Sequence, residues 1–347
     1  MVDGFTIQNG SAVNGGGLHL AGNVTINNCI VKGNKASNYS TAIYASNVTI
    51  KNCQIIGNSY INSARRTVYL NKSVMDSCVI RNNSAYEHSS VYAENGSKVS
   101  NCEFGGGTNR YSDYKGAYFN ASYVSNCKFG KASGSGSCAE LQNGSTMFNC
   151  VFEEITGVSG NMLYVGAKSL ADSCQFIGNT TSGDLIYLYD GGKLNRCRVI
   201  GNSVSNRLMY EYYSSTVSNS LFINNKCQYS GTPFYFYNGL MINCTVANNT
   251  FNVGQIFYLY NSTLKNSVVV GNTRPAGYST ILSLDGTNTA THNMLESTVI
   301  GTDNIDGSMK LAAFADPENG DYSLSEKSYC INAGVDVADT IDLLGSP

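Results

Sequence analysis

The chain has 347 residues, a net charge of −2 and only 13% charged residues, whereas about 25% is usual for soluble domains. Because this composition offers no basic surface, nucleic acid and anionic membranes are not expected as partners. No apolar run approaches the ~20 residues of a membrane-spanning helix. With 42% hydrophobic residues, the chain can still bury a continuous core.

A cysteine recurs every 23 to 25 residues along most of the chain. The series is Cys29, Cys53, Cys78, Cys102, Cys127, Cys150, Cys174 and Cys197, and it continues in register with Ser220, Cys244 and Ser267. Self-similarity at such a period indicates a repeat architecture in which each repeat is one structural unit. Since the repeats hold short apolar stretches and polar turns, the sequence predicts an all-β parallel solenoid.

Other positions repeat together with the cysteine. An apolar residue stands two positions after it, as in Val31 and Phe176, and Asn usually stands five positions after it, as in Asn34 and Asn179. Another Asn often precedes the cysteine directly and predicts a bend, because Asn tolerates left-handed backbone. The bend residues are Asn28, Asn52, Asn101, Asn126, Asn149, Asn219, Asn243 and Asn266.

A second strand is predicted in each coil, ending nine or ten residues before the cysteine. Its flanking residues are apolar, so alternation places its central residue on the outside. That column reads His19, Tyr44, Tyr69, Tyr92, Tyr118, Glu140, Tyr164, Tyr187, Tyr210, Tyr235 and Tyr258, and later coils add Tyr189, Tyr212, Tyr237 and Tyr260 two residues on. Alternation puts one charge, Glu211, inside, which suggests a bulge or a register slip.

The twelve cysteines could indicate disulfides or a metal site. One thiol per coil gives parallel side chains about 4.8 Å apart, which is poor disulfide geometry. The three histidines do not converge on the column, so no zinc site is expected. We therefore predict buried, reduced thiols and no metal; Cys138, Cys227 and Cys330 lie outside the column.

We predict residues 1–300 to form one right-handed parallel β-helix of about 12 coils with three faces, the hand following from strand-crossover chirality. The period loosens after Ser267, with one further coil at Leu282–Leu284 and another around residues 297–299. Residues 301–347 do not repeat and are expected to cap the last coil, protecting its open strand edges. The sequence begins as if within a coil, so a native segment is expected before Met1.

The opening Asp3-Gly4-Phe5-Thr6-Ile7, the Gly15–Leu18 run and repeated Asn-Cys-x-Phe/Val units resemble secreted bacterial right-handed parallel β-helix proteins. The pectate-lyase-like superfamily and the polymorphic outer-membrane repeat proteins are the nearest resemblances, the latter through Phe176–Asn179 and Phe222–Asn225. The tail from Asp316 to Gly334 resembles their closing segment, although Tyr329 stands where proline is usual. The resemblance implies the fold and a secreted or cell-surface location, but the fold hosts several functions.

The first functional hypothesis is a carbohydrate-binding or adhesive surface. A contiguous aromatic surface commonly marks an interaction site, and Tyr combines an apolar ring with a hydroxyl. The candidate residues are Tyr92, Tyr118, Glu140, Tyr164, Tyr187, Tyr189, Tyr210, Tyr212, Tyr235, Tyr237, Tyr258 and Tyr260. The alternative is that Tyr simply suits strands and cross-strand stacking.

The second hypothesis is a polysaccharide lyase or glycoside hydrolase. Glu140 interrupts the column, and Glu94 lies two coils away, at roughly 10 Å by strand spacing. That separation is marginal for an inverting pair, which needs ~6.5–9.5 Å. Both are weak catalytic candidates, and Arg65 and Arg66 stand alone. No cofactor is expected, with calcium implied only for a lyase by the resemblance.

The third hypothesis is a structural stalk or passenger segment that holds another domain away from a cell surface. Low charge, polar turns and a rigid repeat all agree with it. The expected partner is a polysaccharide or surface glycan for the first two hypotheses. An open strip of Tyr side chains would favour binding, and a loop-covered strip would favour the stalk.

Overall fold

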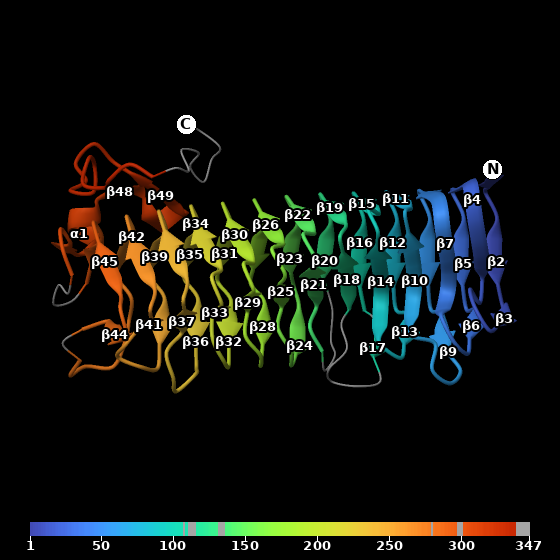
Figure 1. Cartoon of the computed structure of the whole chain (residues 1–347), viewed down its shortest axis with the longest axis horizontal. Coiled ribbons are helices and arrows are strands. Elements are labelled where there is room, and N and C mark those ends of the chain that lie inside the picture. The colour runs from blue at the N-terminus through green and yellow to red at the C-terminus, as the bar shows by residue number, and fades with distance from the viewer. Residues whose placement is uncertain (107, 110–115, 131–135, 279, 297–300, 338–347) are drawn as a thin grey trace. The chain divides into compact units, whose positions relative to one another are not determined.

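The computed structural model describes residues 1–106, 108–109, 116–130, 136–278, 280–296 and 301–337. The chain is an all-β parallel β-solenoid of about 12 turns that fits a right-handed β-helix, as predicted. Figure 1 shows the successive rungs of strands. The chain divides into two compact units, Met1–Gly183 (unit 1) and Asp184–Pro347 (unit 2). The predicted coil at residues 297–299 lies outside the described residues, as does the end of the tail from residue 338.

Unit 1 carries three main columns of parallel strands, and the long strands β4 (Leu18–Asn27) and β7 (Ser40–Lys51) belong to two of them. The post-cysteine column comprises β2 (Thr6–Gln8), β5 (Ile30–Lys32), β8 (Gln54–Ile56), β12 (Val79–Arg81), β16 (Glu103–Gly105), β20 (Lys128–Gly130), β23 (Val151–Glu153) and β27 (Gln175–Ile177). The pre-cysteine column comprises β1 (Val2–Asp3), parts of β4 and β7, β11 (Val74–Asp76), β15 (Lys98–Ser100), β19 (Tyr123–Ser125), β22 (Thr146–Phe148) and β26 (Leu170–Asp172). The tyrosine column comprises β4, β7, β10 (Arg66–Asn71), β14 (His88–Glu94), β18 (Ala117–Asn120), β21 (Ala139–Gln142) and β25 (Leu163–Val165).

Shorter strands complete the coils of unit 1. They are β3 (Ser11–Ala12), β6 (Lys35–Ala36), β9 (Ser59–Tyr60), β13 (Ser84–Ala85), β17 (Thr108–Asn109), β24 (Thr156–Val158) and β28 (Thr180–Thr181).

Unit 2 repeats the same columns. Its tyrosine column comprises β29 (Ile186–Tyr189), β33 (Met209–Tyr212), β37 (Phe234–Tyr237), β41 (Phe257–Tyr260) and β44 (Leu282–Asp285). Its pre-cysteine column comprises β30 (Lys193–Asn195), β34 (Thr216–Ser218), β38 (Leu240–Ile242), β42 (Thr263–Lys265) and β45 (Thr289–Thr291). Its post-cysteine column comprises β31 (Arg198–Ile200), β35 (Leu221–Ile223), β39 (Thr245–Ala247), β43 (Val268–Val270), β46 (Met294–Leu295) and β47 (Ile305–Asp306).

The remaining elements of unit 2 are short strands and a C-terminal segment. They are β32 (Ser203–Val204), β36 (Lys226–Cys227), β40 (Thr250–Phe251), helix α1 (Met309–Ala312), β48 (Phe314–Asp316), the 3-10 helix η1 (Pro317–Asn319) and β49 (Asp321–Leu324). No helix in the described ranges is both long and apolar enough to cross a membrane.

The predicted bends before the cysteines are confirmed. All eight Asn residues of these bends have positive φ. The angle is 53° at Asn101, 52° at Asn126 and 49° at Asn266, and the others are similar. In this left-handed conformation the chain turns between two strands. Each cysteine therefore lies in the bend rather than within a strand, which corrects the expectation of one strand around it.

The interior is built from identical residues stacked in register. Phe104, Phe129, Phe152 and Phe176 stack with ring centroids 4.5 to 4.9 Å apart. The column cysteines are buried free thiols, and the Cys53 backbone N–H donates to Cys78 Sγ at 3.4 Å. Since the thiols fill the interior and accept a hydrogen bond from the backbone of the preceding rung, their regular spacing has a structural cause.

The Asn five positions after the cysteine forms a second interior ladder. Asn225 donates through Nδ2 to Asn249 Oδ1 at 2.9 Å and to the Val199 carbonyl at 2.9 Å. Asn202 donates to Asn225 Oδ1 in the same way. Because a buried amide is costly unless its hydrogen bonds are satisfied, this ladder holds successive coils in one register.

Glu211 is fully buried, as alternation predicted, but the predicted bulge or register slip is wrong. It pairs regularly with Leu188 and Phe236. Serine hydroxyls elsewhere accept from the backbone of the previous coil, as Ser145 Oγ does from Ser122 N. At the coil of Gly239 that hydroxyl is absent, and Glu211 accepts instead from Ser215 N at 2.7 Å and Tyr237 N at 2.9 Å.

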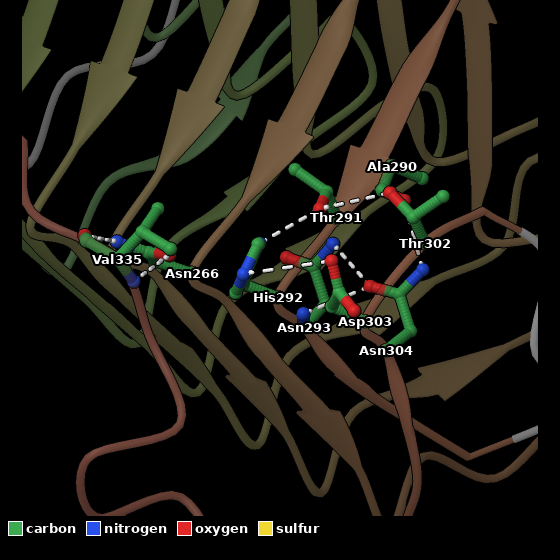
Figure 2. Close-up of polar contacts among 9 residues, drawn as sticks. All are labelled: Asn266, Ala290, Thr291, His292, Asn293, Thr302, Asp303, Asn304 and Val335. Atoms are coloured by element: carbon green, nitrogen blue, oxygen red, sulfur yellow. Dashed lines mark hydrogen bonds and ion pairs between the residues drawn. The ribbon is translucent and has the colours of Figure 1, made fainter.

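The C-terminal segment packs on the outer side of the post-cysteine column of unit 2. Ala312, Phe314 and Tyr322 join a buried cluster with Ile223 and Val270. Further along, Asn266 Nδ2 donates to the Val335 carbonyl at 2.8 Å, and Val335 N donates to Asn266 Oδ1 (Figure 2). The docking face consists of the outward apolar residues Ile223, Ala247 and Val270 on successive coils. A cap over the last coil remains a prediction.

We expect the column thiols to be unreactive in the native protein. Burial raises the pKa of the Cys244 thiol to about 12, and the thiolate is the reactive form. Titration with an aromatic disulfide reagent should label at most the half-buried Cys330 in the native state and all twelve cysteines after denaturation. Cys330→Ser should abolish the native reaction, and rapid labelling of Cys102 or Cys127 would contradict the assignment.

Glu211 makes stability depend on pH. Burial raises its pKa to about 8 from the ordinary 4.5, so the folded state favours the protonated carboxyl. Its contribution is therefore full below about pH 4.5 and is lost as pH rises through 8, by on the order of 4 kcal/mol. Urea unfolding at pH 5, 7 and 9 should show this decline.

A double substitution tests the cause of this decline. A Cβ at Gly239 would lie 2.0 Å from Glu211 Oε2, so Gly239→Ser alone should clash, and Glu211→Leu alone should leave Ser215 N without an acceptor. The pair Glu211→Leu/Gly239→Ser restores the serine pattern of the other coils. It should lose clearly less stability than wild type between pH 5 and 9, and an unchanged pH dependence would refute the role of Glu211.

Candidate functional site: the tyrosine columns

Alternation along the tyrosine-column strands directs one side chain outward between two buried ones. In unit 1, Tyr44, Tyr69, Tyr92 and Tyr118 pair in register on β7, β10, β14 and β18. The ring centroids of Tyr44 and Tyr69 lie 4.8 Å apart, and those of Tyr92 and Tyr118 lie 4.9 Å apart at an interplanar angle of 11°. The predicted outward column therefore exists as a stack of rings.

The column is less exposed than the sequence predicted. Tyr44, Tyr92, Tyr118 and Tyr164 are half-buried, and Tyr69 is only 9% exposed. Stacking explains this, because each ring covers the face of the next. The accessible parts are the ring edges and the hydroxyl groups.

Glu140 occupies the tyrosine position between Tyr118 and Tyr164, as expected from its place in the column. It is only 5% exposed, however, although alternation places it on the outer face. The flanking rings cover it, and Gln142 Nε2 donates to Glu140 Oε1 at 2.8 Å. The carboxylate is held in place by its neighbours.

Glu94 and Glu140 have different hydrogen-bond partners. The Tyr69 hydroxyl donates to Glu94 Oε1, and Glu94 lies level with Asn120 and Gln142 rather than with Glu140. The pKa of the Tyr118 phenol is raised to about 12, mainly by burial and further by the negative charges of Glu140 and Glu94. The phenol is thus neutral at ordinary pH and unsuited to act as a base.

Arg66 and His88 belong to this site, although sequence reasoning left Arg66 standing alone. The Arg66 guanidinium carbon lies 3.9 Å from the Tyr92 ring centroid and 5.3 Å from that of Tyr69. The buried His88 ring lies 5.2 Å from Tyr92 and 5.3 Å from Tyr118. The sequence does carry a signal for Arg66, because it stands three residues before the column residue Tyr69. Arg207 stands at the same distance before Tyr210.

Unit 2 presents two tyrosine columns on β29, β33, β37 and β41, which we call the tyrosine surface. Its members are Tyr187, Tyr210, Tyr235 and Tyr258 in one column and Tyr189, Tyr212, Tyr237 and Tyr260 in the other. All eight are half-buried. The rings of Tyr237 and Tyr260 stack at 4.6 Å and 3°, and those of Tyr235 and Tyr258 at 4.7 Å and 15°.

Four phenols of the tyrosine surface have a raised pKa. The contact with Tyr213, together with partial burial, raises the pKa of Tyr212 to about 12. Burial is the main cause of the raised pKa of Tyr235, Tyr237 and Tyr258. These four side chains therefore offer uncharged hydroxyl groups, each able to donate and to accept.

Arg207 is the counterpart of Arg66 in unit 2. Its guanidinium carbon lies 4.5 Å from the Tyr210 centroid and 5.4 Å from that of Tyr235. Arg207 also pairs with the buried Asp184, with 3.9 Å between Nη1 and Oδ1. At this point the stacking changes, since the Tyr210 and Tyr235 rings meet edge to face at 69°.

A hydroxyl, an imidazole and a carboxylate line up near the C-terminal end of unit 2 (Figure 2). Thr291 Oγ1 lies 2.7 Å from His292 Nδ1, and His292 Nε2 lies 3.7 Å from Asp303 Oδ2. The Asp303 side chain is 70% exposed, so water solvates the carboxylate and weakens the pairing. We assign this cluster to holding the turns together.

Within the described residues, no group of three or more His, Cys, Asp or Glu side chains converges as a metal site would require. The site is aromatic and hydroxylic, with Glu94, Glu140, Arg66 and His88 embedded in unit 1.

No protein-family model and no curated protein matches the chain. Similar solved structures include the tailspike protein of E. coli bacteriophage HK620 in complex with a pentasaccharide, at 14% identity and TM-score 0.47, covering 86% of this chain and 69% of that one. A mannuronic acid specific polysaccharide family 6 lyase from human gut microbiota has 9% identity and TM-score 0.46, covering 87% and 85%. The Agl-KA catalytic domain has 12% identity and TM-score 0.46, covering 83% and 62%. The description of the fold and of the site is therefore drawn from the residues of this chain alone. The resemblance to polymorphic outer-membrane repeat proteins stays a prediction.

Proposed function

We propose that this protein binds an extended glycan along its tyrosine columns, outside the cell or on a cell surface. The observation that carries the proposal is the tyrosine surface of unit 2, with two hydroxyl-bearing side chains on each of four consecutive strands. The hydroxyls recur with the strand spacing of ~4.8 Å. A glycan is a polymer of hydroxyl-bearing rings and can match such a repeat over several rungs.

Because the rings stack on one another, a bound sugar would contact their edges and hydroxyls rather than their faces. A sugar cannot lie on the face of a ring such as Tyr237 that already stacks on its neighbours. It can contact ring edges and exchange hydrogen bonds with the phenol hydroxyls. Because stacking already fixes the rings, little side-chain entropy is lost on binding.

Two other functions compete with this proposal. A structural stalk would use the rings for strand stacking alone and would bind nothing. An enzyme would need Glu140 or Glu94 as acid or base, and both carboxyls are held by neighbouring groups, Gln142 and Tyr69. We therefore favour binding, and the experiments below separate the three.

Removing hydroxyls while keeping the rings tests the proposal. A glycan array identifies the ligand, and titration then compares wild type with Tyr235→Phe/Tyr237→Phe. Since each hydrogen bond contributes about 1 kcal/mol, affinity should fall ~10-fold or more for the pair. Unfolding should change little, because the ring stacking remains.

The matched control is Tyr329→Phe, which removes a hydroxyl from a tyrosine that is 64% exposed and lies outside the columns. Its affinity should equal that of wild type. If no glycan binds, or if the double Phe variant binds as tightly as wild type, the proposed role of the tyrosine surface fails.

Glu140→Gln separates binding from catalysis. A binding surface should keep most of its affinity, because the amide fits the same space. An enzyme using Glu140 as acid or base should lose turnover by ~100-fold or more. The measurement is release of reducing or unsaturated ends from any polysaccharide that binds, and such a loss in the variant would replace the binding proposal with an enzymatic one.

A further inference from the structure

Three neighbouring strands of unit 1 begin with polar residues that pair in register. Arg66 opens β10 and pairs with Ser40 of β7 on one side and His88 of β14 on the other. The register shifts just after Arg66 in both pairings, because each flanking strand has one more residue before its tyrosine. Irregularities of this kind re-aim side chains and are frequent next to functional sites.

Several buried polar atoms at this place lack hydrogen-bond partners among the described residues. They are the Arg66 Nε, Ser40 Oγ and Thr41 Oγ1 atoms. Ser40 and Thr41 are 0% exposed, whereas Arg66 is half-buried. Burying such groups without a partner is costly, and natural proteins rarely do so without a functional reason. The Arg66 Nε–H is an obligate donor, so it needs an acceptor of its own.

The charge of Arg66 is also unmatched. Arg65 pairs with Glu87 at 3.4 Å, Arg81 with Glu103 at 2.7 Å and Arg207 with Asp184 at 3.9 Å. Arg66 has no such ion pair with any residue that the structure describes.

Two carboxyls on or next to β14, the neighbouring strand, have other partners. Glu87 pairs with Arg65, and Glu94 accepts the Tyr69 hydroxyl. The Tyr92 ring, 3.9 Å away, orients the guanidinium without neutralising it.

We propose that the half-buried Arg66, whose strand lies between those of Ser40 and His88, is a subsite for an oxyanion. The ligand group is a carboxylate or a sulfate ester carried by the glycan, so the inference rests on the proposed function and narrows its ligand to an anionic glycan. A planar guanidinium matches two oxygens of such a group bidentately. The tyrosine column then contacts the sugar rings that adjoin the anionic substituent.

The subsite is tested first with inorganic sulfate. Thermal unfolding of wild type, Arg66→Gln and Arg81→Gln is compared in sodium sulfate and in sodium chloride of equal ionic strength; Arg81 lies outside the tyrosine columns and pairs with Glu103. A bound ion stabilises the folded state, so wild type and Arg81→Gln should gain ~1–2 °C more in sulfate than Arg66→Gln does. Equal responses of the three proteins would overturn the subsite.

The second arm uses glycans. Hexasaccharides of uronic acid are titrated beside the same hexasaccharides after reduction of their carboxyl groups to primary alcohols. Arg66→Gln should weaken binding of the acidic form about 10-fold and leave the reduced form unaffected, while Arg81→Gln should bind both as wild type does. Arg66→Lys should recover only part of the loss, because it cannot bind two oxygens in a plane.

The outcomes distinguish the two proposals. Equal affinity of wild type for both hexasaccharides, or equal loss of both in Arg66→Gln, would overturn the inference and leave glycan binding intact. A sulfate response that depends on Arg66, without binding to any glycan, would overturn the proposed function and support the oxyanion subsite alone.

Discussion

Each residue of this solenoid lies one strand spacing, ~4.8 Å, from its counterpart in the next coil. A side chain is therefore acceptable at a repeated position only if it tolerates a copy of itself at that distance. Phe rings meet this condition by stacking, and Asn amides by hydrogen bonding to one another. Carboxylates and guanidinium groups repel their own copies, so each occurs singly in the columns. The low charge of the chain follows from the same constraint.

The candidate site inherits this constraint. Tyr repeats on the outside because its rings stack on one another while each hydroxyl remains at the outer edge. The stacking alone therefore produces a periodic row of hydroxyls. Glu140 interrupts one column of rings, and its neighbours accommodate it by covering it. Arg66 begins β10 and Arg207 lies two residues before β33, and at both places the guanidinium lies over the ring of the next coil.

The repeating part of this structure could be predicted from the sequence, because the in-register Cys, Asn and Tyr positions each report one column. The non-repeating part could not, because it depends on single residues that are near in space and 20 or more apart in sequence. Glu211 is understandable only together with Gly239, whose missing side chain makes room for the carboxyl. The place of Arg66 depends on a local shift in register that the sequence does not reveal. The docking of Phe314 depends on its contact with the outward apolar residues of β35 and β43. The exposure of the tyrosines was overestimated because stacking covers ring faces.

Periodicity also limits what a surface of this kind can recognise. A row of identical hydroxyls binds a repeating polymer equally well in any position shifted by one rung, so the row supplies affinity without fixing a register. A compact ligand would use only one or two rungs and gain little from the rest. A single group that does not repeat breaks this equivalence, because only one placement of the polymer brings an anionic substituent to it. In unit 1 that group is Arg66, which lies against the tyrosine column with its charge unmatched among the described residues. The combination of a repeating column and one singular charge therefore favours a polymeric ligand bound in a defined position over either a small molecule or a sliding chain.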